Sequence, residues 1–387
     1  MFNDLSQYLQ IDREKQRMIA DAMPHLESPN LFYSKRKYMA SEDVSMCEIC
    51  ESISLDHLPP TKYCPECHRK YPEEENFCFD CLVKLKNISD IPKVRDIKTN
   101  PEFKFEGTNS YATFEEIFTP ENAEKINDFK FRLKDYKGII NDIKRTAFLE
   151  FDNLVKSNGL VLDYLDILDK VLLFSKSFVE VDYKSYGQEL GVFAFDRIEV
   201  DDRQLPGLQI TTLMHELSHF LLKEILAHVL CKLLDCTKNS SIDAISTFIL
   251  IYSPLSRLID EYCAHSVEGR FTVYGYQDYS SFLQIQKSLE GEMPSEEIEI
   301  AKSIGNTFSI SIKEILEAYL DDDLRDDIKT QFKEDVLDMP KYDMLAMENC
   351  NKLKSKGFMQ AIWLILSEGF EVASVNIEKL EEYKKNF

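Results

Sequence analysis

Apolar side chains recur at helical spacing along most of the chain, which predicts a protein built mainly from helices. The expected helices span residues 139–155, 160–174, 206–234, 242–252 and 253–269, with acidic helices after about residue 290 and an apolar one at 358–366. Thr119-Pro120 and Ser253-Pro254 mark two helix starts, because a hydroxyl residue caps the first turn and proline fits its first position. The helix over 206–234 is expected to be amphipathic.

A strand pattern is clearest between these groups of helices. Apolar residues cluster over 179–183 and again over 190–200, where Asp201-Asp202 ends the run. These segments predict a hairpin or a small sheet. The fold class is therefore expected to be α+β and predominantly helical.

Changes in pattern along the chain predict five segments. They are an N-terminal helical segment (1–40), a cysteine-rich module (41–90), a polar stretch read as a linker or an irregular wrap (91–118), a mixed domain (119–285) and an acidic helical region (286–387). The cysteine-rich module carries little periodicity, so something other than an apolar core must hold it together.

Composition narrows the classes of function. The 387 residues carry 68 acidic and 46 basic side chains, a formal net charge of −22, which argues against nucleic-acid binding. The N-terminus lacks the pattern of a secretory signal, and no apolar run is long enough to span a membrane. We therefore expect a cytoplasmic protein without a membrane segment.

Six of the ten cysteines form three C-x-x-C pairs. The pairs Cys64/Cys67 and Cys78/Cys81 resemble a zinc ribbon, in which four thiolates hold a structural zinc that replaces a core. Such a ribbon stabilises the fold or recruits a protein partner. The third pair, Cys47/Cys50, either binds a further zinc with other donors such as His57 and His68, or replaces one of the later pairs. The cysteines outside these pairs, Cys231, Cys236, Cys263 and Cys350, are expected in the core.

The helix expected over 206–234 contains the motif H-E-x-x-H. His215 and His219 lie four residues apart on one helix face, so both imidazoles can reach one zinc ion. Glu216 is displaced by about 100° around the helix from His215, where a general base for a zinc-activated water belongs.

A catalytic zinc generally takes a third protein ligand. The helix over 253–269 offers Glu261 and His265 on one face. Here the sequence resembles the gluzincin metallopeptidases, the thermolysin-like group, whose third ligand is a Glu on a helix downstream of H-E-x-x-H. That family typically has an Asp one turn after this Glu, where this chain has His265. Two arrangements stay open: Glu261 as the ligand with His265 beside it, or the reverse.

The resemblance implies a zincin-like domain and a zinc-dependent peptidase that acts on proteins or peptides. Candidate oxyanion donors are Tyr262, Tyr274, Tyr276 and His265. Residues 197–200 are either the sheet edge that pairs with an extended substrate or an ordinary core strand. The alternative function is a non-catalytic zinc-ribbon adaptor with a peptidase-like scaffold, and a third option is a latent enzyme covered by its ribbon or an acidic segment.

Overall fold

The structure is a computed structural model that describes residues 60–99, 101–183, 190–272, 280–289, 291, 293–336 and 352–387. It divides into two compact units, residues 1–92 and 93–387, and each is considered by itself. Several predicted features lie outside the described residues: the helical segment 1–40, and Cys47, Cys50, His57, Tyr274, Tyr276 and Cys350.

The described part of the first unit consists of short antiparallel strands. β1 (Lys62–Tyr63) lies between β2 (Lys70–Tyr71) and β5 (Lys86–Asn87), and β3 (Phe77–Cys78) pairs with β4 (Val83–Lys84). The buried residues at its centre are Cys64, Cys78 and Leu85. So small an apolar core cannot by itself hold a chain segment of this length folded.

The second unit confirms a predominantly helical α+β fold. Its helices are α6 (Phe114–Ile117), α7 (Pro120–Asn127), α8 (Leu133–Ser157), α9 (Ile167–Lys176), α10 (Pro206–Leu234), α11 (Ser240–Tyr252), α12 (Pro254–Phe271), α13 (Ser280–Ser288), α14 (Ser295–Leu316), α15 (Asp322–Val336), α16 (Ser355–Ser374) and α17 (Ile377–Lys384). Among the helices described, no single one is long and apolar enough to cross a membrane.

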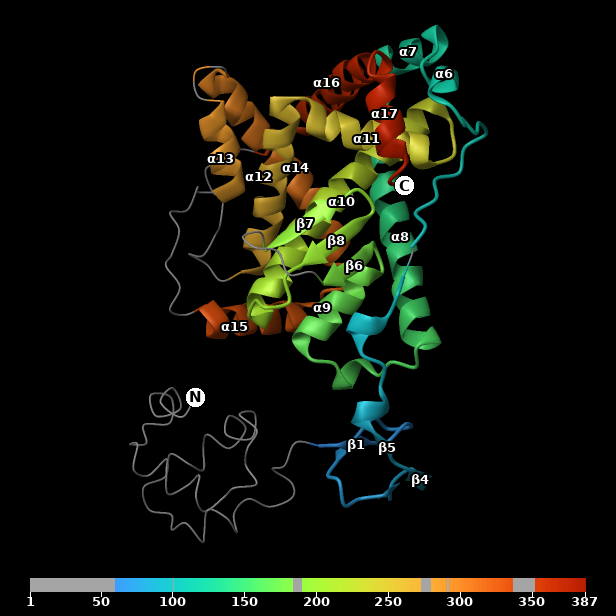
Figure 1. Cartoon of the computed structure of the whole chain (residues 1–387), viewed down its shortest axis with the longest axis vertical. Helices are drawn as coiled ribbons and strands as arrows, with labels where there is room; N and C mark the ends of the chain where they lie inside the picture. The colour runs from blue at the N-terminus through green and yellow to red at the C-terminus, as the bar shows by residue number, and fades with distance from the viewer. Residues whose placement is uncertain are drawn as a thin grey trace. The chain divides into compact units, whose positions relative to one another are not determined.

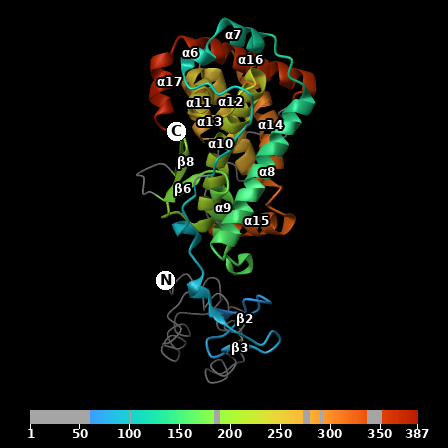
Figure 2. The same cartoon turned by 90° about the vertical axis from the view of Figure 1, so that its right-hand side faces the viewer.

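Helix α10 runs through the middle of this unit, with α9, α11, α12 and α15 packed around it (Figures 1 and 2). The expectation of an amphipathic helix was wrong here. Nearly every side chain of α10 is buried, because helices and strands cover it on all sides. The polar residues of the H-E-x-x-H motif are therefore held inside the unit.

Caps fix the position of the second helix of the site. Ser253 accepts a hydrogen bond from the backbone N–H of Ser256 at 3.0 Å, and Pro254 occupies the first turn of α12. The helix continues two residues past Gly269, to Phe271. Helix α12 packs along α10, which brings its acidic residues to the motif.

A three-stranded sheet lies beside α10. β8 (Arg197–Val200) is its central strand, parallel to β6 (Glu180–Tyr183) and antiparallel to β7 (Gly191–Ala194). The chain reverses between β7 and β8 at Phe195, which has a φ of 58°. Because β8 is paired on both sides, residues 197–200 form a core strand, and β7 is the edge strand next to α10.

Buried side chains occur in the stretch 91–118 that was expected to be a linker or an irregular wrap. Phe103 is buried and stacks against Phe178, with ring centroids 6.1 Å apart. The buried Lys176 donates to the carbonyl of Ile97 at 2.6 Å. These contacts fix the start of the segment against α9 and the sheet.

Candidate metal centres

His215 and His219 converge as the helical spacing predicts. They lie one turn apart on α10, and their Nε2 atoms are 3.2 Å apart. A hydrogen bond between these two nitrogens would require one of them to carry a proton and the other to be unprotonated. Two imidazole nitrogens turned to one point in a buried site are typical of a pair that holds a metal ion.

Glu261 supplies a third donor at the same point. Its Oε2 lies 3.8 Å from His215 Nε2, and the donor atoms of His215, His219 and Glu261 all lie within 4.8 Å of one another. Two imidazoles and one carboxylate form a set that fits zinc. Of the two alternatives on α12, the geometry therefore groups Glu261 with the histidine pair.

Two further carboxylates face the outer nitrogens of the histidines. Glu268 Oε2 lies 3.1 Å from His215 Nδ1, and Asp260 Oδ1 lies 2.9 Å from His219 Nδ1. Such contacts orient imidazoles whose Nε2 atoms bind a metal. Sequence reasoning missed both residues, although Glu268 follows Glu261 by two helical turns on the same face.

Neighbouring charges oppose the effect of burial on the pKa values of the groups in this cluster. Burial disfavours the charged form of His219, but Asp260 outweighs this effect and raises the pKa of His219 to about 10. Burial would raise the pKa of Glu268, yet the hydrogen bond with His215 lowers it overall. The neighbouring carboxylates therefore favour the protonated form of the two imidazoles.

His265 lies in a second layer rather than at the convergence point. Its Nε2 is 2.6 Å from Ser281 Oγ on α13, and its Nδ1 is 3.4 Å from Glu268 Oε2. Ser281 in turn donates to Glu261 Oε2 at 2.5 Å. No motif marks Ser281 in the sequence, because it reaches the site through the packing of α13 on α12.

A cavity of about 380 Å³ opens beside the histidine pair. Its lining, among the described residues, is Gly191, Val192, Phe193, His215, Glu216, His219, Lys223, Thr247, Leu250, Ile251, Asp260, Glu261 and Ser281. The predicted oxyanion donors Tyr262 and His265 are not part of it: Tyr262 is 1 % exposed and packs on Phe282. Their burial in the packing between α12 and α13 explains the difference.

Glu216 lies in the cavity wall, next to the histidine pair. Burial raises the pKa of its carboxyl group above the ordinary value, while His215 and His219 oppose the shift. A backbone hydrogen bond from Phe193 in β7 also lowers it. A carboxyl group with a raised pKa and access to a cavity is suited to exchanging protons near neutral pH.

Gly191 allows β7 to approach α10 closely. A Cβ atom there would lie 2.4 Å from Thr212 Cγ2 and 3.3 Å from Glu216 Cγ. We expect Gly191→Ala to lower the free energy of unfolding by about 1–3 kcal/mol, as overpacking does. Denaturant unfolding measures this loss. Gly138→Ala in α8 is the matched control: nothing lies within 4 Å of its Cβ position, and alanine favours a helix interior, so this variant should lose no stability. A Gly191→Ala protein as stable as the wild type would contradict the close approach.

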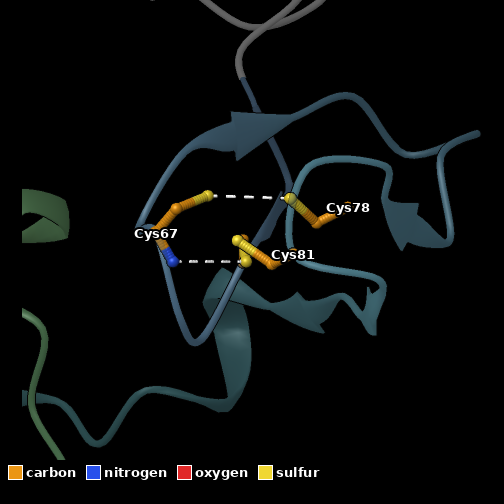
Figure 3. A group of neighbouring side chains, drawn as sticks. Cys67, Cys78 and Cys81 are labelled. Atoms are coloured by element: carbon orange, nitrogen blue, oxygen red, sulfur yellow. Dashed lines mark hydrogen bonds between the residues drawn. The ribbon is translucent and has the colours of Figure 1, made fainter.

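The four ribbon cysteines also converge. Cys64, Cys67, Cys78 and Cys81 place their sulfur atoms within 4.8 Å of one another, and Cys67 Sγ lies 3.6 Å from Cys78 Sγ (Figure 3). Four thiolates about 2.3 Å from one zinc in a tetrahedron would be separated by about 3.8 Å. The cluster could therefore hold a metal ion.

The two cysteine pairs sit in turns of the same shape. The residue after each pair has a positive φ, 60° at His68 and 55° at Leu82. In each turn the N–H of this residue donates to the carbonyl of the first cysteine, at 3.0 Å for Cys64 and 2.8 Å for Cys78. A hydrogen bond from Tyr71 also lowers the pKa of Cys78 to about 6, which favours the thiolate that binds metals.

Comparisons of this chain with protein-family models, with curated proteins and with solved structures give no match. The assignment of a function therefore depends on the geometry of the two centres.

Proposed function

We propose that this protein is a zinc-dependent peptidase whose active site is the cavity beside α10. The observation that carries the proposal is the convergence of His215 and His219 Nε2 with Glu261 Oε2, next to the buried carboxyl group of Glu216. The order of these residues is that of the gluzincins, which the sequence resembles.

Each residue has a separate task in hydrolysis. Zinc, when bound by His215, His219 and Glu261, supplies a Lewis acid that polarises a carbonyl group and lowers the pKa of water. Glu216 accepts the proton of the attacking water and then donates it to the leaving nitrogen of the substrate. Asp260 and Glu268 hold the two imidazoles in orientation through their Nδ1 atoms.

The position of β7 supports a peptide as the substrate. Within the described sheet, β7 pairs with β8 on one side, and its residues Gly191, Val192 and Phe193 line the cavity. An extended peptide can add to such an edge by backbone hydrogen bonds. This would place its carbonyl groups along the histidine pair.

The ribbon cysteines would hold a structural zinc in the same protein. Their separation fits tetrahedral thiolate ligation, and the small core around Cys64, Cys78 and Leu85 leaves the metal as the main source of stability. The ribbon then maintains residues 60–92 as a folded module, available to a protein partner.

The test is incubation of the full-length, zinc-loaded protein with a denatured protein mixture, followed by mass-spectrometric identification of new peptide termini. We expect new termini with the zinc-loaded protein, none after the metal is removed with a chelator, and their return when zinc is added back. A zinc-loaded protein that produces no new termini would favour the adaptor function.

A further inference from the structure

The cavity contains a charged side chain that the hydrolytic steps do not use. Lys223 is the one lysine or arginine among the described residues that line it. It lies on the face of α10 that carries His215 and His219, one turn beyond His219, which corresponds to about 6 Å along the helix axis. Only 3 % of its side chain is exposed, so the ammonium group belongs to the interior of the site.

Lys223 lines both this cavity and a second one, of about 390 Å³. Its Nζ lies 3.1 Å from Glu224 Oε1 and 3.4 Å from Asp243 Oδ1, two carboxylates that line the second cavity and not the first. It also lies 5.1 Å and 4.8 Å from the ring centroids of Phe220 and Phe387. An ammonium group has three N–H donors, so the two ion pairs leave one N–H without a carboxylate.

Thr247 adds an unpartnered hydroxyl group to the same wall. It is 5 % exposed, lines the cavity, and its Oγ1 makes no hydrogen bond among the described residues. It lies one turn after Asp243 on α11, and Leu250 and Ile251 continue this face of the helix. A buried donor without a partner is destabilising, and a ligand oxygen would supply the missing acceptor.

We propose that Lys223 and Thr247 form a subsite for a carboxylate group of the substrate, a proposal that rests on the peptidase function and names the substrate class. The ammonium and the hydroxyl group would both donate to the carboxylate oxygens, and Leu250 and Ile251 would contact the aliphatic part of the residue. The carboxylate comes from an Asp or Glu side chain near the scissile bond or from the C-terminus of the peptide.

The experiment measures binding to the full-length, zinc-loaded Glu216→Gln protein, so it does not depend on hydrolysis. The probes are unlabelled peptides in which one Glu moves through successive positions, each compared with its Gln counterpart by isothermal titration calorimetry. A peptide without acidic residues is compared as the free C-terminal acid and the C-terminal amide. We expect at least one Glu/Gln pair, or the acid/amide pair, to differ tenfold or more in Kd; the pair that differs identifies the source of the carboxylate.

Variants in the same Glu216→Gln background assign the preference to the subsite. Lys223→Met should reduce the ratio of the two Kd values in that pair to about twofold or less. Thr247→Val should lower this ratio, and Lys223→Arg should leave it unchanged. Lys232→Met, at an exposed position of the same helix, is the matched control and should change nothing. Zinc content and circular dichroism verify that each variant is folded.

Equal Kd values for all pairs, or a preference that survives both Lys223→Met and Thr247→Val, would overturn the subsite. If Lys223→Met does not fold, Thr247→Val is the deciding variant. It removes only one hydroxyl group and nearly preserves the size of the side chain, so the protein should still fold. The peptidase function is tested by the appearance of new termini with the active protein, whereas the subsite is tested by peptide binding to the inactive Glu216→Gln variant. Failure of one can therefore be distinguished from failure of the other.

Discussion

Glu216→Gln is expected to abolish the appearance of new peptide termini while the protein keeps its full zinc content. The substitution preserves the size of the side chain but removes its ability to accept a proton, and general-base catalysis is worth about 10²–10⁴-fold in rate. Glu216 is not among the converging donors His215, His219 and Glu261, so zinc binding should be unaffected. The measurement is the rate of terminus formation per zinc-loaded chain.

A second substitution separates loss of the base from loss of the metal. His219→Ala should lower activity to a similar degree, but with one zinc fewer per chain, because it removes a converging nitrogen. If Glu216→Gln kept wild-type activity at full zinc content, the carboxyl group would have no part in hydrolysis and the mechanism would be wrong.

Cys78→Ser is expected to unfold residues 60–92. Structural zinc sites contribute about 10–16 kcal/mol of apparent binding free energy at neutral pH, far more than the apolar contacts of Cys64, Cys78 and Leu85 can provide. Loss of one thiolate should therefore remove one zinc and expose the backbone of this segment. Hydrogen exchange, read segment by segment, measures the effect.

Cys263→Ala provides the comparison for Cys78→Ser. Cys263 is 1 % exposed in the core of the second unit, on α12, and belongs to no group of potential metal ligands among the described residues. The variant should lose some stability through the cavity it creates, but neither zinc nor the protection of residues 60–92. Unchanged protection of residues 60–92 in Cys78→Ser would show that the ribbon does not depend on its metal.

Local sequence patterns predicted the elements that carry the candidate site. Pro206 and Pro254 mark the starts of α10 and α12, and the four-residue spacing of His215 and His219 depends only on helix geometry. The spacing of the ribbon cysteines likewise reflects turns formed by consecutive residues. These features are set by interactions between near neighbours in the chain, so the sequence reveals them.

The parts that the sequence did not reveal depend on contacts between distant segments. Glu268 and Asp260 meet the histidines because α12 crosses α10 at a particular register, and Ser281 reaches Glu261 through the packing of α13. Residues 197–200 are not the sheet edge because β8 pairs with both β6 and β7, which leaves β7 as the edge strand that lines the cavity. Spacing along one helix or strand carries no information on such crossings and pairings.

The most direct test of the metal-dependent centre is the number of zinc ions per chain in the wild type, Glu261→Ala and His265→Ala. Glu261 lies at the convergence point with the histidine pair, whereas His265 contacts Ser281 and Glu268 behind it. We predict that Glu261→Ala contains one zinc fewer than the wild type and that His265→Ala contains the same number. Equal zinc content in the wild type and Glu261→Ala, or a zinc lost in His265→Ala alone, would contradict this account of the site.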